Sequence, residues 1–127
     1  MSIDLRATYP VQFHAGFGFA DAAAIADYLA ELGTSHLYCS PYLQAAPGST
    51  QGYDVVNHHQ VNQELGGAEG HARLITALSE QSLGQVLDIV PNHMAIVGEA
   101  NPWLVGCARE WSIQPLCGIL RRRMGPS

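Results

Sequence analysis

The order of apolar and amphipathic segments limits this chain to a parallel α/β fold. Short apolar segments typical of strands occupy residues 7–13, 36–39 and 84–90, while residues 20–32 and 68–80 have helical spacing. Strands that alternate with helices are joined by right-handed crossovers, so the sheet is expected to be parallel. The third segment is almost continuously apolar, as in strands buried on both faces. The sequence therefore predicts a βαβαβ unit.

The segment 20–32 predicts a single amphipathic helix. Ile25, Leu29 and Leu32 recur at intervals of four and three residues, which places them on one helix face. Gly33 follows, and glycine is the usual residue just beyond a helix C-terminus. We expect the helix to end there.

A long polar connection, residues 40–67, follows the second predicted strand and is rich in Gly, Pro, Asn and Gln. Connections of this length in compact domains are usually functional. An open nucleotide-binding sheet would carry a G-x-G-x-x-G turn after its first strand, but Gly16 and Gly18 are followed by Asp21 where the third glycine belongs. The failed fingerprint favours a barrel over an open sheet.

The charge of the chain restricts the classes of partner that it can bind. The 127 residues carry a net charge of −5 and no lysine, whereas nucleic acids and anionic membranes require clustered cations. Cys39, Cys107 and Cys117 have neither disulfide-framework nor zinc-site spacing. No segment has the pattern of a signal peptide or a membrane span. We expect a cytoplasmic protein with a neutral substrate and no cofactor, and the sequence leaves its oligomeric state open.

Polar residues gather where the third strand ends. Asp88 lies within the apolar segment, and a buried carboxylate requires a bonded partner, which a structural ion pair or a ligand site would supply. Asn92 and His93 follow and have donors and acceptors suited to sugar hydroxyls. The alternative is structural: a loop-capping Asn and a satisfied core His.

The long connection contains a second candidate pair, Tyr53 and Asp54. An aromatic ring beside a carboxylate is suited to stacking on a pyranose while bonding its hydroxyls. A packed loop anchor is the alternative. Residues 47–49 (Pro-Gly-Ser) are expected only to shape the turn, and the pair His58 and His59 is too little to indicate a metal site.

Together these segments resemble the α-amylase family of glycoside hydrolases. Residues 88–93 (Asp-Ile-Val-Pro-Asn-His) resemble the family's first conserved region, at the end of the third barrel strand, and residues 52–55 (Gly-Tyr-Asp-Val) resemble its loop motif after the second. Within the family, residues 7–14, 35–41 and 47–67 are similar to the maltooligosyltrehalose synthases. The resemblance covers about residues 5–103.

Three positions depart from that pattern. Pro10 stands where an arginine is usual, Gln51 where a histidine is usual, and Asn57 where an aspartate is usual. The resemblance nevertheless implies a partial (β/α)8 TIM barrel: residues 1–103 would form the first three βα units, and 104–127 an irregular tail.

The implied activity is an intramolecular transglycosylation that converts the reducing-end α-1,4 link of a maltooligosaccharide into an α,α-1,1 link. Such a retaining reaction uses two carboxyl groups about 5 Å apart. In the family these lie on the fourth and fifth strands, with a third acid on the seventh. We therefore expect no catalytic residue within this chain, which by itself would be inactive.

The same resemblance implies roles for the candidate residues. Tyr53 would stack on the sugar at the cleavage subsite, His93 would bond that sugar, and Asp54 and Asp88 would hold the surrounding network. Asn92 corresponds to a calcium ligand in many amylases, but synthases of this type are not generally calcium enzymes, so no metal is expected. A non-catalytic α-glucan-binding module and another α-amylase-family hydrolase are the alternatives.

Beyond Trp103 the likeness stops and the composition changes. Residues 1–103 contain two arginines and ten acids, whereas 104–127 contain four arginines and one acid. Synonymous codons for the tail, read one base later, can spell a family-like Trp-Trp-Asp-Val-Leu-Glu-Asn-Gly. We hypothesise a single-base frameshift; a nucleotide sequence with no family-like reading one base later would remove it. An interaction tail and a solvated end are the alternatives.

Overall fold

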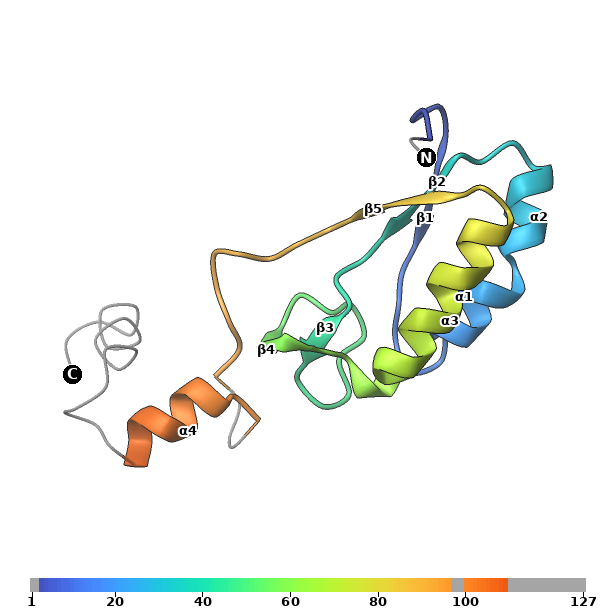
Figure 1. The fold of residues 1–127 in the computed structure, drawn as a ribbon. Helices are drawn as coiled ribbons and strands as arrows, with labels where there is room; N and C mark the ends of the chain where they lie inside the picture. The colour runs from blue at the N-terminus through green and yellow to red at the C-terminus, as the bar shows by residue number, and fades with distance from the viewer. Residues whose placement is uncertain (1–2, 97–99, 110–127) are drawn as a thin grey trace.

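The core of the fold is a parallel three-stranded sheet. In the computed structural model, which describes residues 3–96 and 100–109, the strands are β1 (Thr8–Val11), β2 (His36–Cys39) and β5 (Gly84–Leu87). They lie in the order β1-β2-β5 and all pairs are parallel (Figure 1). The predicted βαβαβ order is confirmed.

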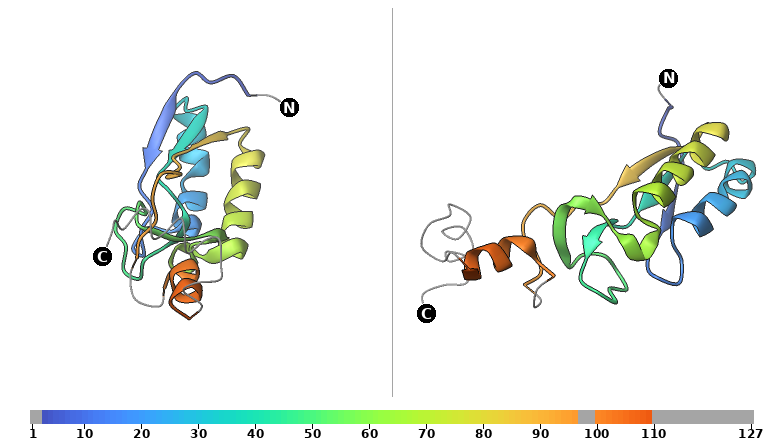
Figure 2. Two further views of the ribbon diagram at one scale, coloured as in Figure 1. Left: turned by 90° about the vertical axis from the view of Figure 1, so that its left-hand side faces the viewer. Right: turned by 60° about the horizontal axis from the view of Figure 1, so that its bottom comes forward.

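Three helices cover one face of this sheet: α1 (Phe19–Ala24), α2 (Ala26–Glu31) and α3 (Gly67–Glu80) (Figures 1 and 2). The core between the layers contains side chains from both, all at most 7% exposed. Its largest members include Phe13, Phe19, Leu29, Leu37, Tyr42 and Leu74. Helix–sheet burial on one side is the layer arrangement expected of an α/β unit.

The prediction of one helix over residues 20–32 is wrong. The chain breaks at Ile25, whose N–H donates to Ala22 O at 3.2 Å in a 3-10-type turn, and α2 begins at Ala26. Leu29 is fully buried as expected, but Leu32 is 58% exposed. The buried face runs through Phe19, Ala22, Ala26 and Leu29 and does not include Leu32. The spacing of the large apolar residues identified the wrong face, because two of the buried positions are alanines.

The predicted stop at Gly33 is confirmed. Gly33 has a φ of +92°, and its N–H donates to Ala30 O while Thr34 N–H donates to Leu29 O. These two bonds form a Schellman cap, which satisfies carbonyls left unpaired at the end of α2.

The long connection is more ordered than predicted. Residues 40–67 contain an antiparallel hairpin of β3 (Leu43–Ala45) and β4 (Val55–Val61), followed by the 3-10 helix η1 (Gln63–Leu65). The hairpin lies at the carboxyl end of the sheet (Figure 1). Its two strands are nine residues apart, so no short turn signal announces their pairing.

The third strand is shorter and less buried than predicted. β5 ends at Leu87 rather than continuing to residue 90, and all four of its residues are only half-buried. Helices cover one face of the described sheet and leave the other open, so burial on both faces was the wrong expectation.

Two serines fasten the ends of β1 to β2. Ser35 Oγ accepts bonds from Arg6 N and Ala7 N at 2.9 and 3.0 Å, and Ser40 Oγ accepts one from Phe13 N at 2.8 Å. Both serines are at most 8% exposed. They satisfy backbone donors where the ladder itself ends, as buried N–H groups require.

Helix α4 (Pro102–Arg109) lies beyond the β3–β4 hairpin, away from the three sheet-covering helices (Figures 1 and 2). Asn101 caps it, since its Oδ1 accepts from Trp103 N and Leu104 N at 2.9 and 3.2 Å. The expected boundary between the barrel part and the tail, after residue 103, falls inside this helix. Three parallel strands are present, but only the first two are followed by helices that cover the sheet. Most of the predicted tail, residues 110–127, lies outside the described residues.

Candidate functional site

Three polar residues form a row across the carboxyl end of the sheet. The strand register aligns Pro10, Tyr38 and Val86 on the open face. Backbone bonds from Ser40 N to Val11 O and from Asp88 N to Cys39 O carry the ladder beyond the strand ends. Because side chains alternate along a strand, the residues two positions later lie next on the same face. This polar row consists of Gln12, Ser40 and Asp88.

The Asp88 carboxylate has a hydroxyl partner rather than an ion-pair partner. Tyr53 Oη donates to Asp88 Oδ2 at 2.6 Å across 35 residues of sequence. Asp88 lies one residue past β5 and is half-buried, so its predicted place inside a buried strand is wrong. The bond favours the neutral phenol and raises the pKa of Tyr53. The Tyr53 ring remains 43% exposed.

His93 and Asn92 lie against the same loop. His93 Nε2 is 3.2 Å from the Tyr53 carbonyl oxygen, and His93 Nδ1 is 2.8 Å from Asn92 Oδ1. Both residues are exposed, so His93 is not the core histidine that was weighed as an alternative. The two sequence motifs, 35 to 40 residues apart, thus meet at Tyr53.

Asp54 faces the loop rather than the strand ends. Ser49 Oγ donates to Asp54 Oδ1, and the same Oγ accepts from Gly52 N at 3.0 Å. Asp54 O also accepts from Ala46 N at 2.9 Å. Asp54 is therefore the anchor of the turn before Tyr53. Ser49, expected only to shape that turn, is its bonding partner.

Gly52 fixes how closely this loop packs. Its φ is +83°, and a Cβ at this position would lie 2.3 Å from Pro41 O. A side chain would therefore meet backbone at a distance that no rotamer change relieves, in a conformation that favours glycine. The glycine thus allows the chain just before Tyr53 to pack closely against Pro41, which follows β2.

A cavity of about 510 Å³ opens between the polar row and the Tyr53 loop. Two aromatic rings, two amides and a hydroxyl are available in its wall, and no charged residue lines it. The lining residues are Pro10, Val11, Gln12, Tyr38, Ser40, Gln51 and Tyr53. Such a surface suits a neutral polyhydroxylated ligand. Two departures from the family pattern, Pro10 and Gln51, lie in this wall.

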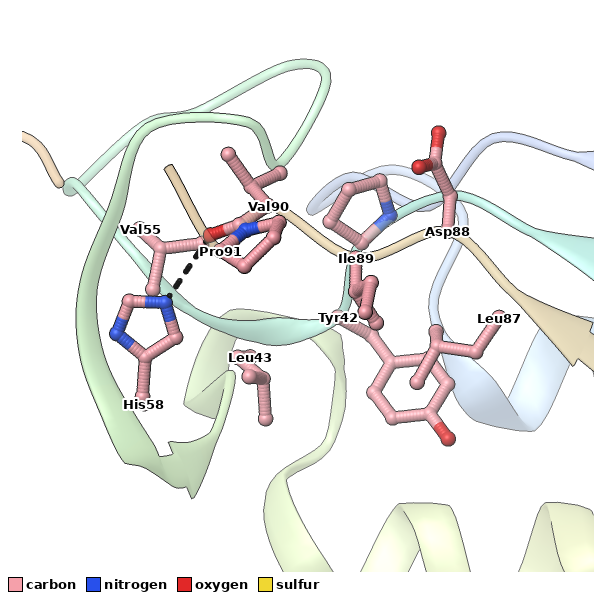
Figure 3. A pocket seen from close by; sticks show the side chains of 10 residues that line it. Tyr42, Leu43, Val55, His58, Leu87, Asp88, Ile89, Val90 and Pro91 are labelled. Atoms are coloured by element: carbon pink, nitrogen blue, oxygen red, sulfur yellow. Dashed lines mark hydrogen bonds between the residues drawn. The ribbon is translucent and has the colours of Figure 1, made fainter. Parts of the chain in front are cut away.

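A second, apolar pocket of about 300 Å³ lies between the hairpin and the segment after β5 (Figure 3). Leu43, Val55 and Val90 line it, and His58 Nε2 is 3.3 Å from Val90 O. The Asp88 carboxylate points to the other side of the chain from Leu87 (Figure 3). Asp88 is nevertheless among the residues that line this pocket.

An aromatic cluster lies behind the site, under the helices. Tyr42 follows β2, and its Oη is 3.1 Å from His71 Nε2 of α3. Phe13 and Phe19 complete the cluster with ring centroids 5.0–6.3 Å apart among the paired rings. Burial lowers the pKa of His71 and raises that of nearby Cys39 to about 11. These groups support the strand end and do not reach the cavity.

Within residues 3–96 and 100–109, no three His, Cys, Asp or Glu residues come together as metal ligands. In the same ranges no helix has the length and apolar character needed to cross a membrane.

Comparison with known proteins gives one consistent result. Residues 21–103 match the family model described as alpha amylase, catalytic domain. A putative maltooligosyl trehalose synthase of Mycobacterium tuberculosis is 46% identical over 109 residues, covering 81% of this chain and 14% of that protein. This chain therefore spans about one seventh of that relative's length.

Solved structures agree. The DSM5389 glycosyltrehalose synthase is similar with a TM-score of 0.83 and 45% identity, over 87% of this chain and 15% of its own. Maltooligosyltrehalose synthase from Arthrobacter ramosus also has a TM-score of 0.83, at 41% identity and the same coverage of both chains.

Proposed function

This chain belongs to the α-amylase family, and from that premise we propose that it forms part of the substrate-binding wall of a maltooligosyltrehalose synthase. The complete enzyme would convert the reducing-end α-1,4 link of a maltooligosaccharide into an α,α-1,1 link. Two relatives with that name are 46% and 41% identical to this chain.

The observation that carries the proposal is the junction of two distant motifs at Tyr53. The Tyr53 ring is exposed, its Oη is fixed on Asp88 at 2.6 Å, and its carbonyl contacts His93 at 3.2 Å. A ring held at both its hydroxyl and its backbone is a preorganised platform for a pyranose face. His93 and Asn92 would bond the sugar's hydroxyls beside it.

The two carboxylates at this junction are engaged by hydroxyl groups. Asp88 accepts from Tyr53, and Asp54 accepts from Ser49. A retaining transglycosylation requires a nucleophile and an acid/base that face each other across the glycosidic bond. We assign Asp54 and Asp88 to positioning, with the nucleophile and acid/base supplied by the rest of a longer enzyme. This chain alone would bind glucan without turning it over.

Calorimetric titration of the 127-residue chain with maltopentaose, together with an assay for non-reducing trehalose ends, tests this. We expect saturable binding without turnover. Tyr53→Ala should weaken this binding roughly 5- to 150-fold, if stacking on a sugar face is worth as much as stacking on a nucleobase, which is on the order of 1–3 kcal/mol. Conversion by this chain would overturn the assignment of the two carboxylates. No binding to the folded chain would overturn the platform.

Leu32→Ser is the matched control, because Leu32 is similarly exposed at 58% but lies at the C-terminal end of α2, away from the loop (Figure 1). We expect the same affinity for maltopentaose as the unsubstituted chain.

A further inference from the structure

Gln12 connects the end of the first strand to the Tyr53 loop. It follows β1 directly and lies in the polar row beside Ser40 and Asp88. Its Nε2 donates to Thr50 O at 3.0 Å, across 38 residues of sequence. Asp88, at the other end of the row, holds Tyr53 itself at 2.6 Å. One loop is thus fastened to β1 and β5 from opposite sides.

The two attachments act on the same short turn. Thr50 and Tyr53 are three residues apart, and the turn between them is stiff because Gly52 packs against Pro41 O and Ser49 bonds both Asp54 and Gly52. A stiff turn transmits a shift at Thr50 to Tyr53 instead of absorbing it. Tyr53 has no such contact with β1 of its own among the described residues.

The remaining anchors of the loop do not depend on Gln12. Gly48 N donates to Glu64 Oε1 at 3.1 Å, and Ala46 N donates to Asp54 O. Gln12 is also exposed. Removing its amide should therefore leave the fold and the hairpin intact. The turn would lose only its hydrogen bond at Thr50 O, on the cavity side.

We infer that Gln12 is a positioning residue, whose amide holds the Thr50–Tyr53 turn over the cavity so that the Tyr53 hydroxyl reaches Asp88. Gln12 also lines the cavity, but this positioning role is exerted through the loop backbone and not through contact with the sugar. Its consequence for glucan affinity rests on the proposed function, whereas its effect on the Tyr53–Asp88 bond does not.

The test is Gln12→Met, which has a similar length and no donor. The ¹³Cζ resonance of labelled Tyr53 is titrated in the unsubstituted chain and in the variant. Loss of the Asp88 bond should move the pKa of Tyr53 down toward its ordinary value of 10. Maltopentaose should bind roughly two- to tenfold more weakly, the range that one neutral hydrogen bond provides.

Gln51→Met is the control, because Gln51 lines the same cavity and lies two residues from Tyr53. It should leave the pKa of Tyr53 unchanged. Gln12→Asn keeps the amide but is one methylene too short, so it should repeat the Gln12→Met result, and it decides the question if the methionine variant does not fold.

An unchanged Tyr53 titration in a folded Gln12 variant overturns the inference, as does an equal shift in Gln51→Met. A lowered pKa with unaltered glucan binding supports the role of Gln12 and counts against the sugar platform instead. The two proposals therefore fail separately.

Discussion

The two faces of the parallel sheet differ in what their side chains do. On the helix-covered face, Leu37 and Cys39 of β2 are fully buried and belong to the continuous core. On the open face, the alternate residue Tyr38 is 41% exposed and lines the cavity with Gln12 and Ser40. Strand alternation thus separates stability from recognition within a single four-residue strand.

The largest expected effect is on neighbours within that strand. Leu37→Ala should lower the free energy of unfolding by about 2–5 kcal/mol, because it leaves a cavity in the core. Tyr38→Ala should change it by less than about 1 kcal/mol, since its side chain is largely outside the packed layer. Urea unfolding followed by circular dichroism measures both. Equal losses would contradict the separation of the faces.

Ser40 tests whether the two faces really differ in their contribution to stability, because it lies on the open face but is only 8% exposed. Ser40→Ala should cost about 1–3 kcal/mol, since the Phe13 N–H loses its acceptor in a buried place. Ser79→Ala on the exposed side of α3 is the control and should have little effect in the same urea experiment. A neutral Ser40→Ala would mean that water replaces the hydroxyl and that this face is uniformly open.

The covered face should also carry a pH dependence. Burial lowers the pKa of His71 below its ordinary 6.5, so the unfolded chain binds the proton more readily than the folded chain. The contribution of His71 to stability is therefore complete above pH 6.5 and declines as the pH falls through the unfolded and then the folded pKa.

Urea midpoints at pH 7.5 and 5.5 measure this effect. His71→Phe keeps an aromatic ring in the cluster but cannot titrate, so the midpoint should fall less on acidification than in the unsubstituted chain. The other five histidines are present in both proteins and cancel. An identical decline in the two proteins would assign the pH dependence elsewhere.

The smallest effect on stability is expected at the open face. Asp88→Asn removes the carboxylate that accepts from Tyr53, so the pKa of Tyr53 should fall toward its ordinary value while the urea midpoint stays nearly constant. Labelled-tyrosine nuclear magnetic resonance follows the titration. Asp54→Asn is the matched control, because Asp54 bonds Ser49 instead. If both variants shift Tyr53 equally, the loop and not the direct bond sets its pKa.

Local patterns predicted the elements whose causes are local. β2 was expected at residues 36–39 and occurs there, and α3 begins within one residue of its predicted start. Gly33 ends α2 as expected because a Schellman cap depends only on neighbouring residues. The break at Ile25 was missed because the helical spacing of the buried residues continues across it. The exposure of Leu32 was missed because the buried face includes the small residues Ala22 and Ala26.

For the candidate site, too, the sequence predicted the residues but not their long-range contacts. Tyr53, Asp54, Asp88, Asn92 and His93 were identified by residue type and resemblance, but their pairings join residues far apart in sequence. Asp54 and Asp88 were expected to serve one network, yet one bonds within its own turn and the other bonds Tyr53. Gln12 was not singled out as a site residue. Its position two residues after Pro10 on a predicted strand was the available signal.

The serines that flank β2 have a consequence for strand pairing. Ser35 and Ser40 meet Ala7 and Phe13, so the distance between the two serines measures the length of β1. Sliding β1 by one residue would break both contacts at once and turn Gln12 toward the helices, because alternate residues face opposite sides. The two serines together therefore stabilise a single register of β1 against β2. The position of Gln12 at the cavity depends on that register.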